Sequence, residues 1–253
     1  MKMQSLLVAL MAFTSVWLSS CGGGGTSTTP FFQPPVFVAE AHSATDGTGP
    51  DFNQSTLSLS ITGSNTLLLV AWHSEFDNGL PDGWSATCNG VAGTEIVDTN
   101  GYTGGDGNRR FRIYYWLNPS PGTATIVVAN QGSGDNELAV SAVLFSGVSQ
   151  NSPIGTPVLD VSTADRAGES ETAPSTSNDL VAHVIADALF TRGTLGDGET
   201  SRSIANDGKH QADGDASLWI STKPGSAPST TVSSSGWASR VINGVAITLH
   251  GIS

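Results

Sequence analysis

Three residues that could carry chemistry stand at alternate positions after an apolar run: His73, Glu75 and Asp77. If a strand continues through them, their side chains share one face, because side chains alternate along a β-strand. An imidazole and two carboxylates on one face could bind a metal, or the carboxylates could act as acid and base in hydrolysis. The alternative is the solvated end of a strand.

Acidic, glycine-rich loops form a second candidate set. Calcium takes six to eight oxygen ligands on flexible backbone, and such loops can supply them. The alternative is turn chemistry, since Asp and Asn side chains mimic turns and Gly supplies positive φ. No loop has the regular spacing of a calcium hand. If calcium is bound, the expected ligands are Asp106, Asn108, Asp213 and Asp215.

Arginines cluster at Arg109, Arg110 and Arg112 in a chain that is poor in basic residues. Guanidinium groups could hold a carboxylate or sulfate of an acidic glycan through paired hydrogen bonds. The alternative is ion pairing with the acidic residues of the protein itself, which outnumber Lys and Arg by 22 to 10.

Large aromatic residues near predicted loops form the last candidate set: Trp84, Tyr102 and Trp237. Aromatic rings can stack on the apolar faces of sugars, so these three could line a glycan site. A large aromatic residue in a β protein can equally belong to the core.

The N-terminus has the pattern of an export signal. A basic start at Lys2 precedes an apolar run over residues 5–18, which is too short for a comfortable membrane span. Leu18-Ser19-Ser20-Cys21 then resembles the bacterial lipobox, which implies a signal peptide over residues 1–20 and a lipid such as palmitate on Cys21. The alternative is an ordinary secretory leader with a chance cysteine.

Residues 21–35, rich in Gly, Thr and Pro, are predicted to be a flexible tether that links a membrane to a folded head. No acidic residue follows Cys21 directly. In lipoproteins of this kind that pattern indicates the outer membrane or the cell surface of a bacterial envelope. The membrane is therefore one expected partner, reached through the anchor.

Composition restricts the remaining partners. The 253-residue chain has a formal net charge of −12, and only 13% of its residues are charged. This charge argues against nucleic acid and anionic lipid headgroups as targets, because both are negatively charged. Cys88 shares a face with apolar neighbours, so it is predicted to be an inert core thiol.

Apolar residues cluster in strand-length runs separated by Gly, Pro and Asn, which is typical of a sandwich or barrel. Residues 56–61 alternate between apolar and polar side chains, whereas residues 67–72 and 138–145 are apolar on both faces. Further strands are predicted in these ranges: 36–41, 111–117, 123–129, 156–161, 180–186, 217–221, 230–234 and 240–249. No long stretch has helical periodicity.

The strand pattern occurs twice. Trp116 matches Trp219, Pro121-Gly122 match Pro224-Gly225, and Ser64-Asn65 match Ser177-Asn178. We therefore predict an all-β fold: a single antiparallel, jelly-roll-like β-sandwich over residues 36–253, built from pseudo-repeats at about 55–149 and 170–253. The second repeat has Ala186, Ala188 and Phe190 at the positions of His73, Glu75 and Asp77.

Two stretches, residues 115–123 and Val143-Leu144-Phe145-Ser146-Gly147-Val148, resemble a β-sandwich module of secreted bacterial and phage-associated proteins. The resemblance covers most of residues 36–253. It implies a concanavalin-like or jelly-roll fold and an extracellular setting. It assigns no functional residue.

No catalytic motif of the common hydrolase, P-loop or dinucleotide-binding type occurs, so an enzymatic activity is neither indicated nor excluded. The expected function is that of a non-catalytic cell-surface lipoprotein that binds a glycan or a protein, with calcium as the one cofactor considered. The alternatives are a surface polysaccharide hydrolase that uses Glu75 and Asp77, and a structural component of the envelope or an extracellular assembly.

Overall fold

The fold is known from a computed structural model. It describes residues 32–252 except 46–53, 77–82, 100–101, 105–106, 130–135, 163–165, 188–192, 207–215 and 241. The described residues form eighteen strands and no helix, which confirms the all-β prediction. No helix in these ranges is long and apolar enough to cross a membrane.

The first half of the chain forms two antiparallel sheets. The larger sheet has the order β1 (Val36–Thr45), β10 (Asn136–Ser146), β3 (Leu67–Phe76), β8 (Gly107–Leu117) and β6 (Thr94–Asp98), with β7 (Tyr102–Gly104) also on β8. The smaller sheet has the order β2 (Gln54–Ile61), β9 (Gly122–Ala129), β4 (Ser85–Cys88) and β5 (Val91–Ala92).

The second half forms two more sheets. The larger has the order β11 (Val158–Asp160), β18 (Ile242–His250), β13 (Asp179–Asp187), β16 (Ser217–Pro224) and β15 (Thr200–Ala205). The smaller has the order β12 (Arg166–Pro174), β17 (Ser229–Arg240) and β14 (Thr194–Leu195). The β12 strand was not among the strands predicted from the sequence.

The two halves have the same strand order. In the larger sheets β1, β10, β3, β8 and β6 correspond to β11, β18, β13, β16 and β15. In the smaller sheets β2, β9 and β4 correspond to β12, β17 and β14. In chain order, β1, β2, β3 and β4 alternate between the larger and the smaller sheet of the first half, and β11, β12, β13 and β14 do the same in the second half. Such alternation is typical of a jelly roll. The sequence repeat is therefore matched by a repeat of topology.

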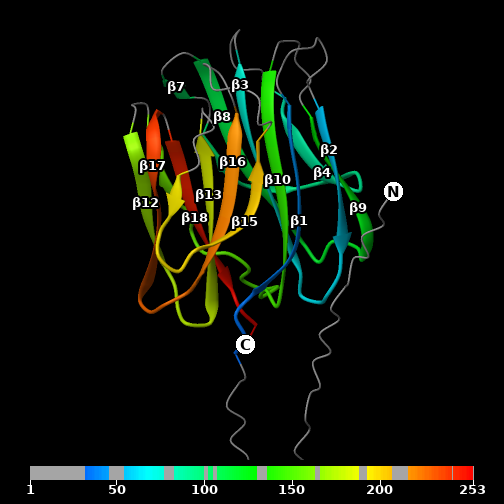
Figure 1. Cartoon of the computed structure of the whole chain (residues 1–253). Coiled ribbons are helices and arrows are strands. Elements are labelled where there is room, and N and C mark those ends of the chain that lie inside the picture. Colours follow the sequence, from blue (N-terminus) through cyan, green and yellow to red (C-terminus); the bar gives the residue numbers. More distant parts are fainter. Residues whose placement is uncertain are drawn as a thin grey trace, which may run out of the picture. The chain divides into compact units, whose positions relative to one another are not determined.

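The two larger sheets pack face to face over one shared interior. Leu69 and Phe111 of the first half and Ile220 and Ile247 of the second belong to the same buried cluster. Each larger sheet is also covered on its other face by the smaller sheet of its own half. The four sheets are arranged as successive layers in Figure 1. This layering explains why β3, β10, β13 and β18 are apolar on both faces.

Polar contacts also link the two halves across the shared interior. The Ser203 hydroxyl on β15 lies 3.0 Å from Glu40 Oε2, to which it donates, and 3.1 Å from Ser141 Oγ. Glu40 and Ser141 lie on β1 and β10, so these hydrogen bonds cross from one repeat to the other. Separation of the repeats would break these hydrogen bonds and would expose the apolar surface around them.

The two ends of the described chain meet. Gln33 N donates to Ile252 O at 3.3 Å, and Ile252 N donates to Gly147 O at 3.2 Å. The start of the domain, the end of the first repeat and the end of the second repeat are thus joined in one place. The predicted signal peptide, Cys21 and most of the predicted tether lie outside the described residues.

Local sequence accounts for the turns and edges. Asn89 and Gly90 have φ values of 50° and 78° and form the tight turn between β4 and β5, as the Asn-Gly pair predicts. Cys88 precedes this turn and is buried, as expected from its apolar neighbours. The β2 strand buries Leu57, Leu59 and Ile61 and exposes the residues between them, which matches its alternating sequence.

Replacement of Phe111 by Ala tests the shared interior. Phe111 is fully buried in the cluster between the two larger sheets. We expect Phe111→Ala to lower the free energy of unfolding by about 3–5 kcal/mol, because it leaves a cavity that two sheets cannot close. Chemical denaturation followed by tryptophan fluorescence measures the change. Val91→Ala is the control: Val91 is 63% exposed, so a change within about 0.5 kcal/mol is expected. Similar effects for the two variants would contradict the packing described here.

Candidate functional site

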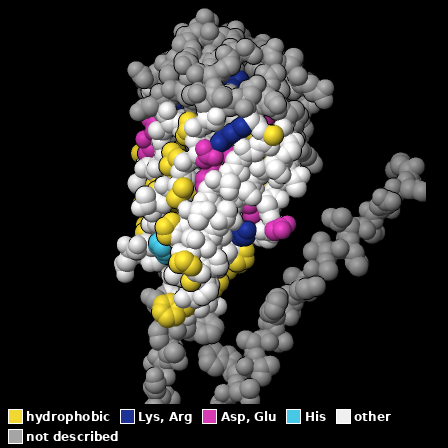
Figure 2. Space-filling model, turned by 90° about the vertical axis from the view of Figure 1, so that its left-hand side faces the viewer, with side chains coloured by type: hydrophobic (Ala, Val, Ile, Leu, Met, Phe, Trp, Pro, Cys, Tyr) yellow, Lys and Arg dark blue, Asp and Glu magenta, His cyan; other side chains and the backbone are white. Residues whose placement is uncertain are grey.

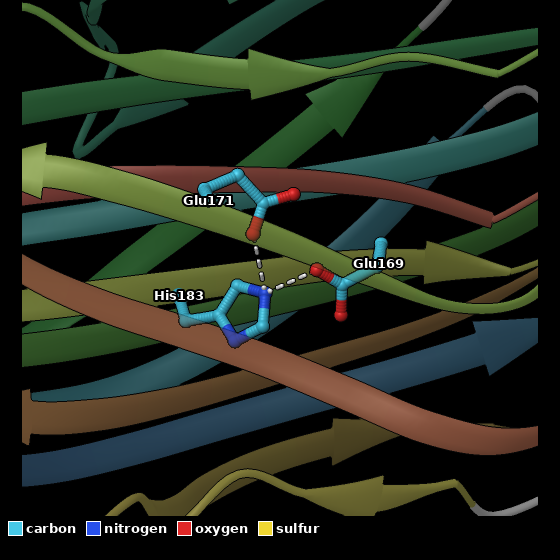
Figure 3. Close-up of side chains that lie close together, drawn as sticks. All are labelled: Glu169, Glu171 and His183. Carbon is cyan, nitrogen blue, oxygen red and sulfur yellow. Dashed lines mark hydrogen bonds and ion pairs between the residues drawn. The ribbon is translucent and has the colours of Figure 1, made fainter.

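Four ionisable side chains meet between the two sheets of the second repeat. His183 of β13 lies at the centre, Glu169 and Glu171 reach it from β12, and Glu199 reaches it from the residue before β15. All four side chains have no exposed surface. Figure 3 shows both β12 glutamates pointing toward the same imidazole nitrogen. We call these four residues the glutamate–histidine cluster.

The imidazole of His183 has a carboxylate partner on each side. Its Nε2 lies 3.2 Å from Glu169 Oε2 and 3.2 Å from Glu171 Oε2. Its Nδ1 lies 2.9 Å from Glu199 Oε2. Because an ionised carboxylate only accepts hydrogen bonds, this contact places a proton on Nδ1. The two ring nitrogens therefore have different surroundings.

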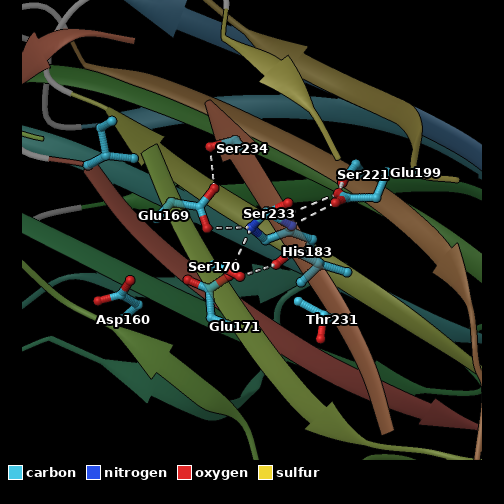
Figure 4. A network of polar contacts seen from close by, with 12 residues as sticks. Asp160, Glu169, Ser170, Glu171, His183, Glu199, Ser221, Thr231, Ser233 and Ser234 are labelled. Atoms are coloured by element: carbon cyan, nitrogen blue, oxygen red, sulfur yellow. Dashed lines mark hydrogen bonds and ion pairs between the residues drawn. The ribbon is translucent and has the colours of Figure 1, made fainter. Parts of the chain in front are cut away.

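Two of the glutamates are held by further hydrogen bonds, as Figure 4 shows. Glu199 accepts from Ser221 Oγ at 2.6 Å and from Ser233 N at 2.7 Å. Glu169 Oε1 accepts from the Ser234 hydroxyl, which itself accepts from the indole of Trp237 at 2.6 Å. These contacts fix the orientation of both carboxylates.

Glu171 differs from the other two glutamates. Neither of its carboxylate oxygens accepts a well-formed hydrogen bond among the described residues: its polar contacts are with His183 Nε2 at 3.2 Å and with the neighbouring Glu169 carboxyl group. A buried carboxylate ordinarily meets several donors, because its desolvation is costly. The Glu171 carboxylate therefore has spare capacity to bind a cation or proton.

Gly244 of β18 makes room for the cluster. A Cβ atom at Gly244 would collide with the Glu171 carboxylate and would lie 2.7 Å from Glu169 Oε2. Its φ is not among the positive values of the chain, so space rather than backbone conformation requires glycine here. The site thus depends on the absence of a side chain as well as on the four that form it.

The first repeat has an apolar interior at the corresponding positions. Counted from Asn65 and Asn178, 113 residues apart, His183 corresponds to Val70. The strand registers place Leu57 and Leu59 opposite Ile126 and Ala124, as Glu169 and Glu171 stand opposite Ser234 and Val232. All of these first-repeat residues are buried. The ionisable cluster therefore belongs to the second repeat alone.

In β12 the charged side chains point into the interior and the uncharged polar side chains point to the solvent, which is the reverse of the usual arrangement. Glu169 and Glu171 face inward and are buried, whereas Ser170 and Thr172 between and beside them are exposed. Figure 2 shows the face on the left of Figure 1, where few Asp or Glu side chains appear among the described residues. Acidic residues that could have been solvated on this strand are instead placed in the interior.

Burial and mutual contact shift the pKa values of the cluster in opposite directions. Burial raises the pKa of Glu171 to about 7, and the neighbouring charge of Glu169 adds to the rise. Burial alone would lower the pKa of His183, but its three glutamate partners outweigh this and raise that pKa well above its usual value. Burial opposes ionisation of Glu169 and Glu199, yet contact with His183 leaves the pKa of each below its usual value.

The cluster has an excess of acid over base. Three carboxylates surround one imidazole, which can carry at most one positive charge. Buried charges in proteins are as a rule paired or bound to metals. Because the side chains are sealed from solvent, a polymeric substrate has no access to them, so the arrangement suits the holding of an ion or a proton.

Of the first predicted site, the structure describes the side chain of His73 alone. His73 is fully buried at the face shared by the two larger sheets, and burial, together with the charge of Arg109, lowers its pKa to about 3. The side chain of Glu75 and the whole of Asp77 lie outside the described part of the chain. His73 is therefore a neutral interior residue.

The predicted arginine site consists of internal ion pairs where it is described. Arg110 Nη2 and Arg112 Nη2 both lie 2.7 Å from Asp98 Oδ2. Arg112 also lies over the ring of Trp72, with 5.9 Å between the guanidinium carbon and the ring centroid. Arg109 is buried. These contacts match the alternative of pairing with the protein's own acids.

The predicted aromatic site is divided between two interiors. Trp84 is 4% exposed and packs on Trp72, with ring centroids 4.6 Å apart. Trp237 is 6% exposed and donates to Ser234 in the surroundings of Glu169. Rings buried to this extent offer no face to a sugar. The side chain of Tyr102 lies outside the described part.

The predicted calcium residues lie largely outside the described part of the chain. Asp106, Asp213 and Asp215 are not described, and of Asn108 only the backbone in β8 is described.

An open pocket lies elsewhere, at one edge of the first repeat. It has a volume of about 280 Å³ and lies between the β4–β5 hairpin and the end of β8. Its walls combine rings and aliphatic groups with amides and hydroxyls; they include Asn89, Val91, Thr94, Tyr115, Trp116 and Asn118. Trp116 Nε1 donates to Val91 O at 2.9 Å, which fixes the indole against the hairpin.

Comparison with known proteins gave no relative: no family model, no curated protein and no solved structure matches the chain.

Replacement of His73 tests the interior placement of the first predicted site. The folded protein keeps His73 neutral down to about pH 3, whereas the unfolded chain takes up a proton below about 6.5. The unfolded state then binds more protons, so stability is full above pH 6.5 and falls as the pH decreases toward 3. We expect His73→Gln to remove up to ~1.4 kcal/mol per pH unit of this dependence between pH 6 and 4.

Denaturant titrations at a series of pH values measure the effect. His42→Gln is the matched control, because the His42 side chain is 46% exposed. Parallel stability curves for His73→Gln and the wild type would rule out a neutral, buried His73.

Proposed function

We propose that the chain is a non-catalytic binding protein, anchored to a bacterial envelope by a lipid on Cys21, and that it takes a glycan in the pocket of the first repeat. The observation that carries the proposal is the composition of the pocket wall. Sugars offer apolar ring faces edged by hydroxyl groups, and binding sites for such ligands combine aromatic or aliphatic surface with a few polar groups.

The pocket has both kinds of surface. Val91 and the partly buried Tyr115 provide apolar area, and Asn89 and Asn118 provide amides. Both asparagines have positive φ and fixed side chains: Asn89 Oδ1 accepts from Thr125 N and Asn118 Oδ1 accepts from Thr66 N. A wall held in this way is preorganised, which lowers the entropic cost of binding.

The absence of acid–base chemistry at the pocket supports a binding role. Among the described residues that line it there is no carboxylate and no imidazole, and burial raises the pKa of its one thiol, Cys88. General acid–base hydrolysis of a glycoside needs two carboxyl groups within reach of the substrate. The place where carboxylates do gather, the glutamate–histidine cluster, is closed to solvent.

Blocking the pocket tests the proposed binding site. We expect Val91→Trp to weaken glycan binding at least ~10-fold, because the indole would occupy the pocket from an exposed edge position. A glycan array with the full chain in detergent identifies the ligand, and titration measures the loss. Leu159→Trp is the control, since Leu159 is an exposed aliphatic residue on an edge strand of the second repeat.

Three results would contradict the proposal: unchanged binding by Val91→Trp, an array without any bound glycan, or release of reducing ends from a bound polysaccharide. The last would favour the hydrolase alternative with Glu75 and Asp77. Capture of a protein alone would favour a surface adhesion role.

Replacement of Cys21 tests the anchor. We expect Cys21→Ser to abolish palmitate labelling and to move the protein from the membrane fraction to the soluble fraction, because acyl chains alone would hold it there. Metabolic labelling and fractionation measure both effects. Cys88→Ser is the control, since the Cys88 thiol is buried and should not be acylated. Membrane retention of Cys21→Ser would refute the lipid anchor.

A further inference from the structure

We propose that Glu169, Glu171 and His183 bind one divalent transition-metal ion inside the second repeat, with Zn²⁺ as the ion that fits best. This inference does not depend on the proposed function. It rests on the geometry of three ligand atoms, on the fixation of the imidazole from behind, and on the unsatisfied carboxylate of Glu171.

The ligand atoms have the separations that a shared ion requires. Glu169 Oε2 and Glu171 Oε2 each lie 3.2 Å from His183 Nε2, and all three atoms lie within 4.8 Å of one another. Zinc ligands lie about 2.0–2.2 Å from the ion. Two such ligands are therefore about 3.0 Å apart at right angles and about 3.4 Å apart at tetrahedral angles. The two nitrogen–oxygen distances fall between these values.

The orientation of His183 is that of a metal ligand. Its Nδ1 proton is donated to Glu199 Oε2 at 2.9 Å, and Glu199 is itself held by Ser221 and Ser233. A histidine that binds a metal ordinarily donates its other ring N–H to a carboxylate or carbonyl, which fixes the tautomer and makes the ligand nitrogen more basic. Glu199 is thus a positioning residue that directs the Nε2 lone pair toward Glu169 and Glu171.

The two β12 carboxylates provide enough donor atoms. Glu169 Oε1 is occupied by the Ser234 hydroxyl, which leaves Oε2 facing the site. The Glu171 side chain has no exposed surface, and its Oε2, which lies 3.2 Å from His183 Nε2, accepts no hydrogen bond among the described residues, so it is available to an ion. One oxygen of Glu169, one of Glu171 and Nε2 make three protein donors, within the coordination number of four that is usual for zinc.

The ligand set favours a transition metal over calcium. Calcium prefers six to eight oxygens, whereas this cluster offers few oxygens and one imidazole nitrogen. Imidazole with carboxylates suits Zn²⁺ and, with added ligands, Mn²⁺. Because all four side chains are sealed, the ion would have a structural role and would neutralise the excess of buried carboxylate.

The competing explanation is a metal-free network in which a protonated His183 is shared by the glutamates. With Glu171 protonated it leaves two carboxylates against one positive charge, and it gives the Glu171 carboxyl group no partner beyond His183 and Glu169. The two explanations differ in one measurable property, the uptake of an ion.

Metal content and refolding provide the primary test. The full chain in detergent is analysed for metals as purified, then unfolded, stripped with a chelator and refolded with ZnCl₂, MnCl₂, CaCl₂ or no metal, because a buried site fills during folding. We expect one Zn²⁺ per chain, with Mn²⁺ as a weaker substitute, and a higher melting temperature only with these ions. No saturable uptake of Zn²⁺ or Mn²⁺ by the refolded wild type would overturn the proposal, as would equal uptake of Ca²⁺.

Variants place the ion in the cluster. Glu171→Gln keeps the shape of the side chain and should weaken Zn²⁺ binding more than ~100-fold, and Glu199→Gln should weaken it ~10–100-fold through loss of imidazole orientation. Gly244→Ala should abolish binding by displacing both β12 carboxylates. Glu95→Gln is the control, because Glu95 lies outside the cluster and accepts from Tyr114.

One result with these variants would contradict the proposed metal site. Stoichiometric Zn²⁺ binding that persists in Glu171→Gln and in Gly244→Ala would place the ion elsewhere and overturn the assignment. If either variant fails to refold, the wild-type titration still decides, since metal-free refolding to full thermal stability would establish the protonated network.

Discussion

The burial of three carboxylates with one imidazole is the interaction on which the second repeat depends. Each carboxylate placed between two sheets is unfavourable alone; all three are stabilised by contact with His183, and Glu169 and Glu199 also accept hydrogen bonds from serines. The apolar side chains on the same face of β13, Val181 and Ile185, belong to two separate small clusters on either side of the histidine. The first repeat has instead one continuous apolar interior. The polar cluster thus replaces hydrophobic packing in the middle of its sandwich.

Duplication makes this exchange possible. The two repeats have the same strand order, and their larger sheets pack on one shared core. The scaffold therefore does not depend only on the core between the larger and the smaller sheet of one repeat. One copy retains Val70 where the other has His183. The two copies also differ at their edges, since the open pocket lies beside the β4–β5 hairpin of the first repeat. One scaffold has therefore acquired two different local environments.

Much of the fold could be predicted from the sequence, because the spacing of apolar residues along a strand indicates which side chains are buried. The alternation of β2, the two-sided apolar runs of β3 and β10, and the core position of Cys88 follow from side-chain pattern alone. The cluster could not be predicted in this way. A rule that assigns charged residues to the solvent turns Glu169 and Glu171 outward, whereas Ser170 and Thr172 are the exposed residues. The available signal was His183, an isolated polar residue in an apolar run, but its partners are distant in sequence and meet it only through sheet packing.

The junction of Gln33, Gly147 and Ile252 has a mechanical consequence. Force that arrives through the N-terminal segment does not meet β1 as a free edge that could be peeled away. It is shared with the ends of both copies through the backbone hydrogen bonds from Gln33 to Ile252 and from Ile252 to Gly147. Tension applied at Gln33 therefore acts on both repeats at once.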